Sequence, residues 1–200
     1  MSAGTGSAIV HLIGYPGVGK YTVAKELVRL ADGPERRFVL VDNHLTSNVI
    51  FAVLPVDGSE AEPLPDVVWD RVDDVRAALL RTIEELSPAD WSFIFTNVAL
   101  EGDPADLRSV DRVRALAAAR GSRYLPVRLR CDADEHLRRV VQPDRTARNK
   151  WTDADAVRAY SSTADLISID DPAPIDIDVT HRSPELTAAL ILDHLAAAHE

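Results

Sequence analysis

The nine residues from Gly14 to Thr22 constrain the fold of this chain more than any other segment. They read Gly-Tyr-Pro-Gly-Val-Gly-Lys-Tyr-Thr and directly follow the apolar run from Ala8 to Ile13. The apolar run predicts a buried parallel strand, and a helix is expected from Gly19 to Leu30. A glycine-rich turn between them presents backbone N–H groups, the positive end of a helix and a lysine. These groups together bind phosphate, so we predict a phosphate site here.

Strand and helix patterns alternate along the rest of the chain. Short apolar runs predict further strands at residues 38–41, 91–98, 124–129 and 175–179, and helices are expected between and after them. The segment from Leu54 to Pro65, which carries three prolines and several acids, is expected to be a loop. Strands separated by helices favour an α/β fold with a mostly parallel sheet covered on both faces. We expect a single domain over residues 1–200.

Several residue patterns place the ends and faces of these helices. The segment 66–86 predicts an amphipathic helix with one buried stripe, formed by Val68, Val72, Val75, Leu79, Ile83 and Leu86. Asp103 before Pro104 predicts an N-cap, and Gly121 is expected to end that helix near Arg120. Asp132 with Glu135 predicts a capping box for a helix that reaches Val141, where Pro143 stops it. A short helix is expected after Thr152, and Ser183 opens the last one.

Charge and cysteine content exclude some classes of function. The net charge of −10 opposes broad binding of nucleic acid, which needs a basic surface. Cations are nevertheless concentrated in one stretch, which holds Arg138, Arg139, Arg145, Arg148 and Lys150. One cysteine, Cys131, allows no internal disulfide, and neither a signal peptide nor a run of about 20 apolar residues is visible. We therefore expect a cytoplasmic protein that uses no membrane.

The pattern Gly-x-Pro-Gly-x-Gly-Lys-x-Thr resembles adenylate kinase and its small-molecule kinase relatives. The resemblance implies a three-layer P-loop fold like that of the nucleoside monophosphate kinases, with a five-stranded parallel sheet and a small lid. It also implies ATP and Mg²⁺ as cofactors. The implied nucleotide contacts are Gly14, Pro16, Gly17, Val18, Gly19, Lys20, Tyr21 and Thr22. Because Tyr21 stands where the general P-loop has Ser or Thr, Thr22 is expected to hold the metal, directly or through water.

The same resemblance suggests residues for the acceptor site. Asp42, at the end of the second predicted strand, matches the acid that contacts the acceptor hydroxyl in shikimate-kinase-like enzymes, and His44 is the alternative base. From the residues alone, Asp42 could equally cap the following helix. Asn97 ends the third predicted strand, where many P-loop proteins carry Asp, and it is expected to orient the substrate. Glu101 or Asp103 could contact the metal through water.

The basic stretch and the end of the chain complete the implied site. Residues 141–152 resemble the mobile lid of these kinases, with Arg145 and Arg148 as the catalytic arginines and Arg139 at the nucleotide. The segment that includes Thr180, His181 and Ser183 resembles the loop that passes the nucleotide base. The alternative for that segment is an ordinary turn capped by Ser183.

These observations predict an ATP-dependent phosphotransferase that moves the γ-phosphoryl group to a hydroxyl or phosphate of a small molecule. Lys20, Asp42, Arg145 and Arg148 are its predicted catalytic residues. One alternative is a nucleotide-binding switch or accessory ATPase without an acceptor, and another uses an RNA end or a nucleotide sugar, the latter as zeta-toxin-like kinases do. The acceptor pocket is expected within residues 45–70, where Phe51, Leu54, Val56 and Trp69 are either core or substrate contacts.

Overall fold

The sheet is the framework that positions every candidate site residue. In the computed structural model, the described residues are 6–31, 33, 37–55, 64–142, 153–163, 165–170, 172 and 174–197. The five strands are β1 Ala8–Ile13, β2 Phe38–Asp42, β3 Ser92–Asn97, β4 Arg123–Arg130 and β5 Ile175–Asp178. They pair in the order β2-β3-β1-β4-β5, and every pair is parallel. The predicted α/β fold with a five-stranded parallel sheet is confirmed.

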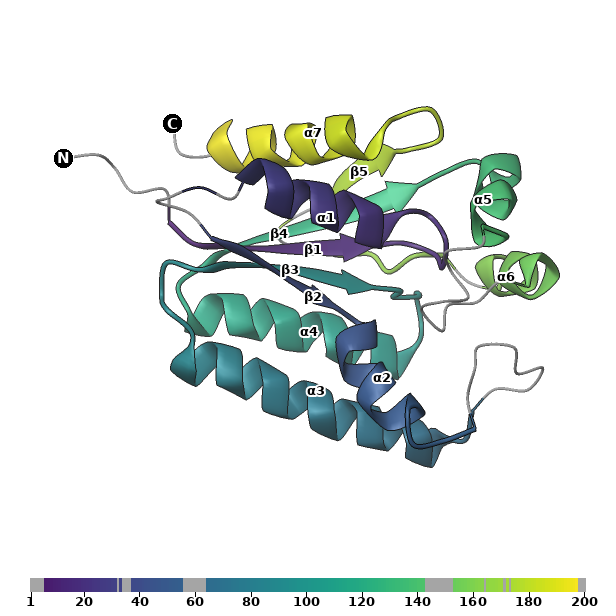
Figure 1. The fold of residues 1–200 in the computed structure, drawn as a ribbon, viewed down its shortest axis with the longest axis horizontal. Helices are drawn as coiled ribbons and strands as arrows, with labels where there is room; N and C mark the ends of the chain where they lie inside the picture. The colour runs from purple at the N-terminus through teal and green to yellow at the C-terminus, as the bar shows by residue number, and fades with distance from the viewer. Residues whose placement is uncertain are drawn as a thin grey trace.

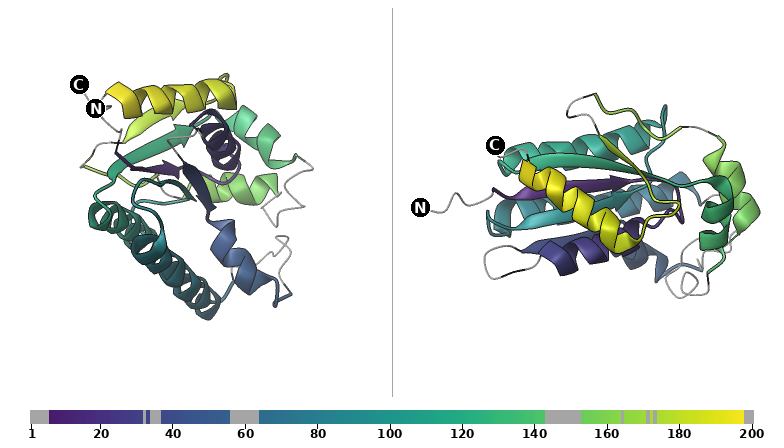
Figure 2. Two further views of the ribbon diagram at one scale, coloured as in Figure 1. Left: turned by 60° about the vertical axis from the view of Figure 1, so that its left-hand side comes forward. Right: turned by 90° about the horizontal axis from the view of Figure 1, so that it is seen from above.

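Helices cover both faces of this sheet (Figure 1). They are α1 Lys20–Ala31, α2 His44–Phe51, α3 Asp66–Leu86, α4 Pro104–Ala119, α5 Ala133–Val140, α6 Ala154–Ser161 and α7 Pro184–Ala197. Figures 1 and 2 agree that α1 and α7 lie on one side, whereas α3 and α4 lie on the other. Helices α5 and α6 lie beyond the ends toward which the strand arrows point (Figure 1). The carboxyl edge of the sheet is therefore where loops and helix ends gather.

Two of the apolar cores lie on opposite faces of the sheet. Leu12 and Ile94 pack with Leu27 of α1 and Ile191 of α7 in the first core. The second core contains Ile9, Val41, Phe93 and Phe95, packed with residues of α3 and α4. Since side chains alternate along a strand, Asp42 and Thr96 belong to the α1 face, and Asn97 belongs to the α3 and α4 face. This alternation decides which polar groups meet at the carboxyl edge.

Helix α3 has the predicted bounds, but its buried stripe differs from the prediction. Val72, Leu80 and Ile83 are buried, whereas Leu86 is 77% exposed. Leu86 is the last residue of the helix, and the carbonyls of Ile83 and Ser87 at this end accept hydrogen bonds from Arg120. A guanidinium group therefore covers the end of α3 in place of apolar packing.

The caps of the helices agree with the sequence in part. The Asp103 carboxylate accepts from the N–H groups of Ala105 and Asp106, as an N-cap should. Asp132 likewise accepts from Glu135 N, but the reciprocal bond of a capping box is missing, because the Asp132 N–H donates to Thr180 Oγ1. The cap position of α2 is Asn43 and not Asp42. The alternative reading of Asp42 as the helix cap is therefore wrong.

No helix in the described part of the chain is long and apolar enough to cross a membrane.

Candidate functional site

The loop between β1 and α1 has the geometry of a phosphate cradle. Gly17 and Gly19 have φ angles of +95° and +112°, in the region that favours glycine. Gly14 is packed so closely that a Cβ atom would lie 2.8 Å from the Leu129 carbonyl oxygen. Among the described residues, the N–H groups of Gly17 and Gly19 have no hydrogen-bond acceptor. These donors, next to the N-terminus of α1, fit a phosphate group.

The side chain of the lysine in this loop folds back onto the residues that begin the loop. Lys20 is the first residue of α1, and its Nζ atom donates to the carbonyl oxygens of Gly14 at 2.5 Å and Tyr15 at 3.0 Å. Tyr21 follows on the first turn, where the Lys25 Nζ atom lies 5.2 Å from the centre of its ring. Thr22 is exposed. The hydroxyl predicted to meet the metal is thus open to solvent at the start of the helix.

Helix α5 braces this loop from outside the sheet. The buried His136 places Nε2 2.6 Å from the carbonyl oxygen of Pro16, and this nitrogen carries the proton because a carbonyl only accepts. Val140 packs so closely that a Cβ on Gly17 would lie 2.6 Å from its Cγ2 atom. Sequence reasoning did not identify His136, whose only visible signal is its place on the helix that precedes the predicted lid.

Arg139 connects the loop to the segment after β5. Its guanidinium donates to the carbonyl oxygens of Val18 at 2.9 Å, Val179 at 2.7 Å and Thr180 at 3.3 Å. Its Nε atom donates to Glu135, which also accepts from Arg138, and these two arginines lower the pKa of Glu135 to about 2. Arg139 was predicted to contact the nucleotide. In this structure it holds together the two segments predicted to surround that nucleotide.

The segment predicted to pass the nucleotide base is held in place by hydrogen bonds, several of them from its own side chains. Thr180 Oγ1 accepts from Asp132 N at 2.9 Å, and Thr180 N donates to Asp178 at 2.8 Å. Ser183 Oγ accepts from Leu186 N at 3.2 Å, so its side chain caps α7, as the alternative reading of this turn required. His181 is exposed beside them. Contact of these residues with a base stays a prediction.

Asp42 is held at the carboxyl end of β2. Thr96, opposite it on β3, donates its hydroxyl to the Asp42 carboxylate and accepts from Asn43 N at 3.2 Å. The carboxylate is half-buried and lies on the face of the sheet that carries α1. His44 begins α2 two residues later. The structure therefore brings Asp42, the predicted acceptor residue, to the edge of the sheet that also carries the glycine loop.

Asn97 points to the other face, where it belongs to a buried polar chain. Its Oδ1 atom lies 3.0 Å from His11 Nε2, and its Nδ2 atom donates to Ser109 Oγ at 3.3 Å. His11 Nδ1 lies 2.9 Å from Tyr124 Oη. His11 is fully buried in β1, and burial lowers its pKa to about 4, so the imidazole is neutral at pH 7. Sequence reasoning did not identify His11, a polar residue in the middle of an apolar strand.

A small pocket opens beside Asn97, between α2, α3 and α4. It has a volume of about 20 Å³, enough for roughly one water molecule. Its polar lining consists of Asp42, Asn43, Thr46, Arg76, Asn97 and Ser109. Asp73 accepts from both Arg76 and Arg112, at 2.8 and 3.1 Å. Burial raises the pKa of nearby Asp106 to about 6.

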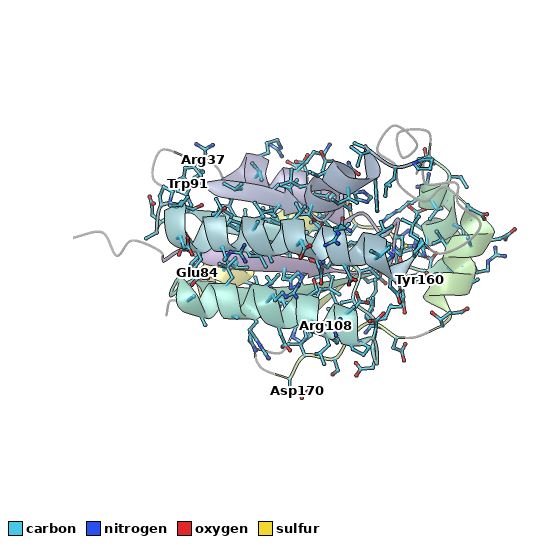
Figure 3. The ribbon with its side chains drawn as sticks, turned by 90° about the horizontal axis from the view of Figure 1, so that it is seen from below. Arg37, Glu84, Trp91, Arg108, Tyr160 and Asp170 are labelled. Atoms are coloured by element: carbon cyan, nitrogen blue, oxygen red, sulfur yellow. The ribbon has the colours of Figure 1, made fainter. Side chains whose placement is uncertain are left out.

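Helices α3 and α4 carry charged side chains, among them the labelled Glu84 and Arg108 (Figure 3). Tyr160 of α6 lies toward the carboxyl edge in this view, and the labelled Arg37 and Trp91 lie at the opposite end. The guanidinium of Arg37 stacks 4.4 Å from the centre of the Trp91 ring. The candidate site and this cation–π pair therefore occupy opposite ends of the sheet.

Three further predictions concern the rest of the site. Arg145 and Arg148, with most of the predicted lid, lie outside the described residues, as does Val56. Phe51 is buried and makes an edge-to-face contact with Trp69 at 5.8 Å, whereas Trp69 itself is 48% exposed and Leu54 is also exposed. Phe51 is therefore a core residue. Within the described ranges, no three His, Cys, Asp or Glu side chains form a cluster that could hold a metal ion.

Several solved structures with the same fold are kinases. A gluconokinase from Sinorhizobium meliloti 1021 aligns with a TM-score of 0.62 at 17% identity, covering 97% of this chain and 94% of that one. The APS kinase of Mycobacterium tuberculosis in complex with AMPPNP and APS aligns with a TM-score of 0.59 at 15% identity, covering 96% and 98%. Shikimate kinase from Acinetobacter baumannii in complex with shikimate aligns with a TM-score of 0.55 at 17% identity, covering 96% and 94%.

No family model matches the sequence, and no curated protein matches it significantly. At identities of 15 to 17%, the structural likeness establishes the fold. The predicted resemblance to P-loop kinases is confirmed at that level.

Proposed function

We propose that this protein is an ATP-dependent phosphotransferase that moves the γ-phosphoryl group to a hydroxyl or phosphate of a small molecule. The observation that carries the proposal is the position of Asp42. Its carboxylate is fixed by Thr96 at the carboxyl edge of the sheet, on the face from which α1 and Lys20 extend. A nucleotide loop and an acceptor carboxylate on one edge are the two halves of a kinase site.

Each residue of the loop has a separate task in this proposal. The N–H groups of Gly17 and Gly19 bind phosphate oxygens, and Lys20 exchanges its bonds with the loop carbonyls for the outer phosphates. Thr22 holds Mg²⁺ directly or through water. The metal, when bound, neutralises charge on the phosphates. Arg139 and His136 hold the backbone of the loop in the conformation in which its N–H groups can bind phosphate.

Asp42 orients the acceptor hydroxyl and receives its proton. In phosphoryl transfer through a loose transition state, positioning contributes more than proton removal, so a fixed carboxylate is sufficient. His44 is the second candidate for this task, because it begins the helix that follows. Arg145 and Arg148 are proposed to meet the transferring phosphoryl group when the lid closes and excludes water.

Calorimetric titration of Mg·ATP into the protein and into Lys20→Ala tests the nucleotide half. We expect the variant to lose at least tenfold in affinity, about 1.4 kcal/mol of binding free energy. The matched control is Arg29→Ala, which removes a cation from the far end of the same helix, where Arg29 pairs with Glu26 and Glu185. Equal affinities for all three proteins would contradict the proposed role of the loop.

A screen for phosphate transfer tests the acceptor half. Nucleosides, sugars, hydroxyl-bearing antibiotics and small hydroxy acids are offered with Mg·ATP, and gluconate and shikimate are included because gluconokinase and shikimate kinase share the fold. A correct acceptor should raise ADP formation well above slow hydrolysis, and Asp42→Asn should abolish that increase. Tight ATP binding without transfer to any acceptor would favour the nucleotide-binding switch instead.

A further inference from the structure

The buried polar chain is a series of hydrogen-bonded side chains from Tyr124 to Ser109. It runs from strand to strand along one face of the sheet and ends at the pocket beside Asn97. It runs from Tyr124 through His11 and Asn97 to Ser109, on strands β4, β1 and β3 and helix α4. His11 and Asn97 are 0% and 9% exposed, and Ser109 is 6% exposed. Polar groups buried to this extent must satisfy one another, so the direction of each hydrogen bond in the chain can be worked out.

The positions of the protons in this series of hydrogen bonds determine whether the oxygen or the nitrogen of the Asn97 amide group faces the pocket. A neutral imidazole has one N–H donor and one acceptor nitrogen. Asn97 Oδ1 can only accept, so the His11 proton is on Nε2, and Nδ1 then accepts from the Tyr124 hydroxyl. The amide oxygen of Asn97 is consequently occupied in the core, and its two N–H donors face outward. One of them reaches Ser109, which leaves the other directed to the pocket.

The neighbouring groups in the pocket are donors as well. Ser109 accepts from Asn97, so its own hydroxyl proton remains to be donated. Arg76 has a side chain only 21% exposed, and within the described residues its single hydrogen bond is the one from Nη1 to Asp73. The other guanidinium N–H groups of Arg76 have no acceptor there. Three buried or mostly buried side chains thus present hydrogen-bond donors to one cavity.

We propose that this pocket binds a carboxylate group of the acceptor molecule, and that His11 and Tyr124 are positioning residues that keep Asn97 in its donor orientation. The inference rests on the proposed phosphotransferase function, because Asp42 lines the same pocket. Asp42 and Asn97 are the last residues of β2 and β3 and both line the pocket, so an acceptor whose carboxylate lies against Asn97, Ser109 and Arg76 would reach Asp42 around the carboxyl edge of the sheet. The substrate class is therefore a small hydroxy acid.

The donors of the pocket favour a carboxylate. Its volume of about 20 Å³ has room for roughly one water-sized group, such as a carboxylate oxygen. Asp73 is shared by Arg76 and Arg112, and Asp106 is a second acidic side chain near Arg76, but among the described residues only Asp73 accepts a hydrogen bond from Arg76. Arginine binds carboxylates in the plane of its fork, and amide and hydroxyl donors complete the oxygen lone pairs.

Nuclear magnetic resonance of the full chain tests the pocket without turnover. In ¹⁵N spectra we expect the His11 imidazole to be protonated at Nε2 and not at Nδ1. Sodium acetate, titrated against sodium chloride at equal ionic strength, should shift the side-chain amide signals of Asn97 and saturate. Shifts equal to those with chloride, or an Nδ1-protonated His11, would overturn the proposal. Saturating shifts with inorganic phosphate but not with acetate would overturn the choice of carboxylate.

Matched variants distinguish the side chains that bind the carboxylate from those that only support the pocket. Arg76→Lys and Ser109→Ala should each weaken acetate binding by at least threefold. Arg71→Lys, an exposed arginine on the same helix paired with Asp74, should leave it unchanged. Tyr124→Phe removes one hydroxyl and keeps the ring. Without that donor at Nδ1, the Nε2-protonated form of His11 is less strongly favoured, and the Asn97 amide signals should broaden. Unchanged acetate binding in both Arg76→Lys and Ser109→Ala would overturn the assignment of the pocket.

The acceptor preference gives a second readout. Polyhydroxy acids, the corresponding neutral sugars and the corresponding sugar phosphates are compared at equal concentration with Mg·ATP. We expect kcat/KM to be at least tenfold higher for the acid, and Arg76→Lys to raise KM for the acid more than it lowers kcat. Preference for the neutral sugar or the sugar phosphate would overturn the inference. ATP binding without acetate binding contradicts only the pocket, whereas acetate binding without ATP binding contradicts the proposed function.

Discussion

Arg139 donates from Nη1 to the carbonyl oxygen of Val18 over 2.9 Å, so helix α5 holds the glycine loop by its backbone. The same guanidinium reaches Val179 after β5 at 2.7 Å. The two segments predicted to enclose the nucleotide are thereby set at a fixed spacing by one side chain. Arg139 was predicted to contact the nucleotide, and its bonds to Val18 and Val179 also shape the place where that ligand is expected.

Replacing Arg139 by lysine should therefore weaken ATP binding without touching the loop itself. Lysine keeps the charge but cannot reach two carbonyl oxygens with one planar group. Loss of hydrogen bonds from a charged donor costs about 1.5–3 kcal/mol, and we expect ATP affinity to fall about tenfold and the melting temperature to drop. Arg138→Lys is the control, since Arg138 is exposed and contacts the same Glu135. Equal losses in both variants would mean that the bonds of Arg139 to the carbonyl oxygens of Val18 and Val179 do not support ATP binding.

The close packing of Gly17 against α5 can be tested separately from its backbone angle. Gly17→Ala should be more destabilising than Gly102→Ala. Both residues have positive φ, at +95° and +79°, so both variants bear a left-handed backbone cost of about 1–2 kcal/mol. Only at Gly17 would the added Cβ lie 2.6 Å from Val140, whereas nothing lies within 4 Å at Gly102. Urea unfolding measures the difference, and similar free energies of unfolding would argue against a tight contact with α5.

Thr96 should matter for turnover because its hydroxyl group holds the Asp42 carboxylate. Thr96→Val has nearly the same shape but lacks the hydroxyl that donates to Asp42 and accepts from Asn43 N. Without this bond, the Asp42 carboxylate loses one of the contacts that orient it, and we expect kcat to fall about tenfold. Thr96→Ser keeps the hydroxyl and should retain most activity. If Val and Ser variants lose the same activity, packing and not the hydrogen bond is responsible.

The sequence was informative wherever local chemistry decides the structure. The glycine loop, the alternation of strands and helices and the cap at Asp103 depend on neighbouring residues, and the structure has them where they were expected. The half-formed capping box at Asp132 differs because its N–H meets Thr180, which lies 48 residues away. A partner at that distance in the chain cannot be found from one sequence.

The candidate site shows the same division. Asp42 could be placed at the edge of the sheet because a short apolar run ends there. Asn97 ends its strand in the same way, yet its direction depends on His11, 86 residues earlier, and on Ser109 in the next helix. A histidine within an apolar strand does signal that a buried partner must exist. Which residue satisfies it follows only from the register that sets Ile13 opposite Asn97.

His11 also predicts how stability depends on pH. Its folded pKa of about 4 lies below the ordinary value of 6.5, so below pH 6.5 the unfolded chain binds a proton that the folded protein excludes. The contribution of this residue to stability is therefore lost as pH falls from 6.5 toward 4, and between pH 7 and pH 5 the loss is about 2 kcal/mol. Asp106 acts in the opposite direction, because its folded pKa of about 6 favours the protonated, folded state as pH falls.

Comparison of wild type with His11→Gln isolates the histidine, since Asp106 is present in both proteins. The variant is expected to be less stable at pH 7, because glutamine cannot reproduce both hydrogen bonds of the imidazole to Tyr124 and Asn97. The gap between the two free energies of unfolding should narrow by about 2 kcal/mol at pH 5, where only the wild type still bears the cost of a neutral buried histidine. Urea unfolding at the two pH values measures both gaps, and a constant gap would mean that His11 accepts a proton in the folded protein at pH 5.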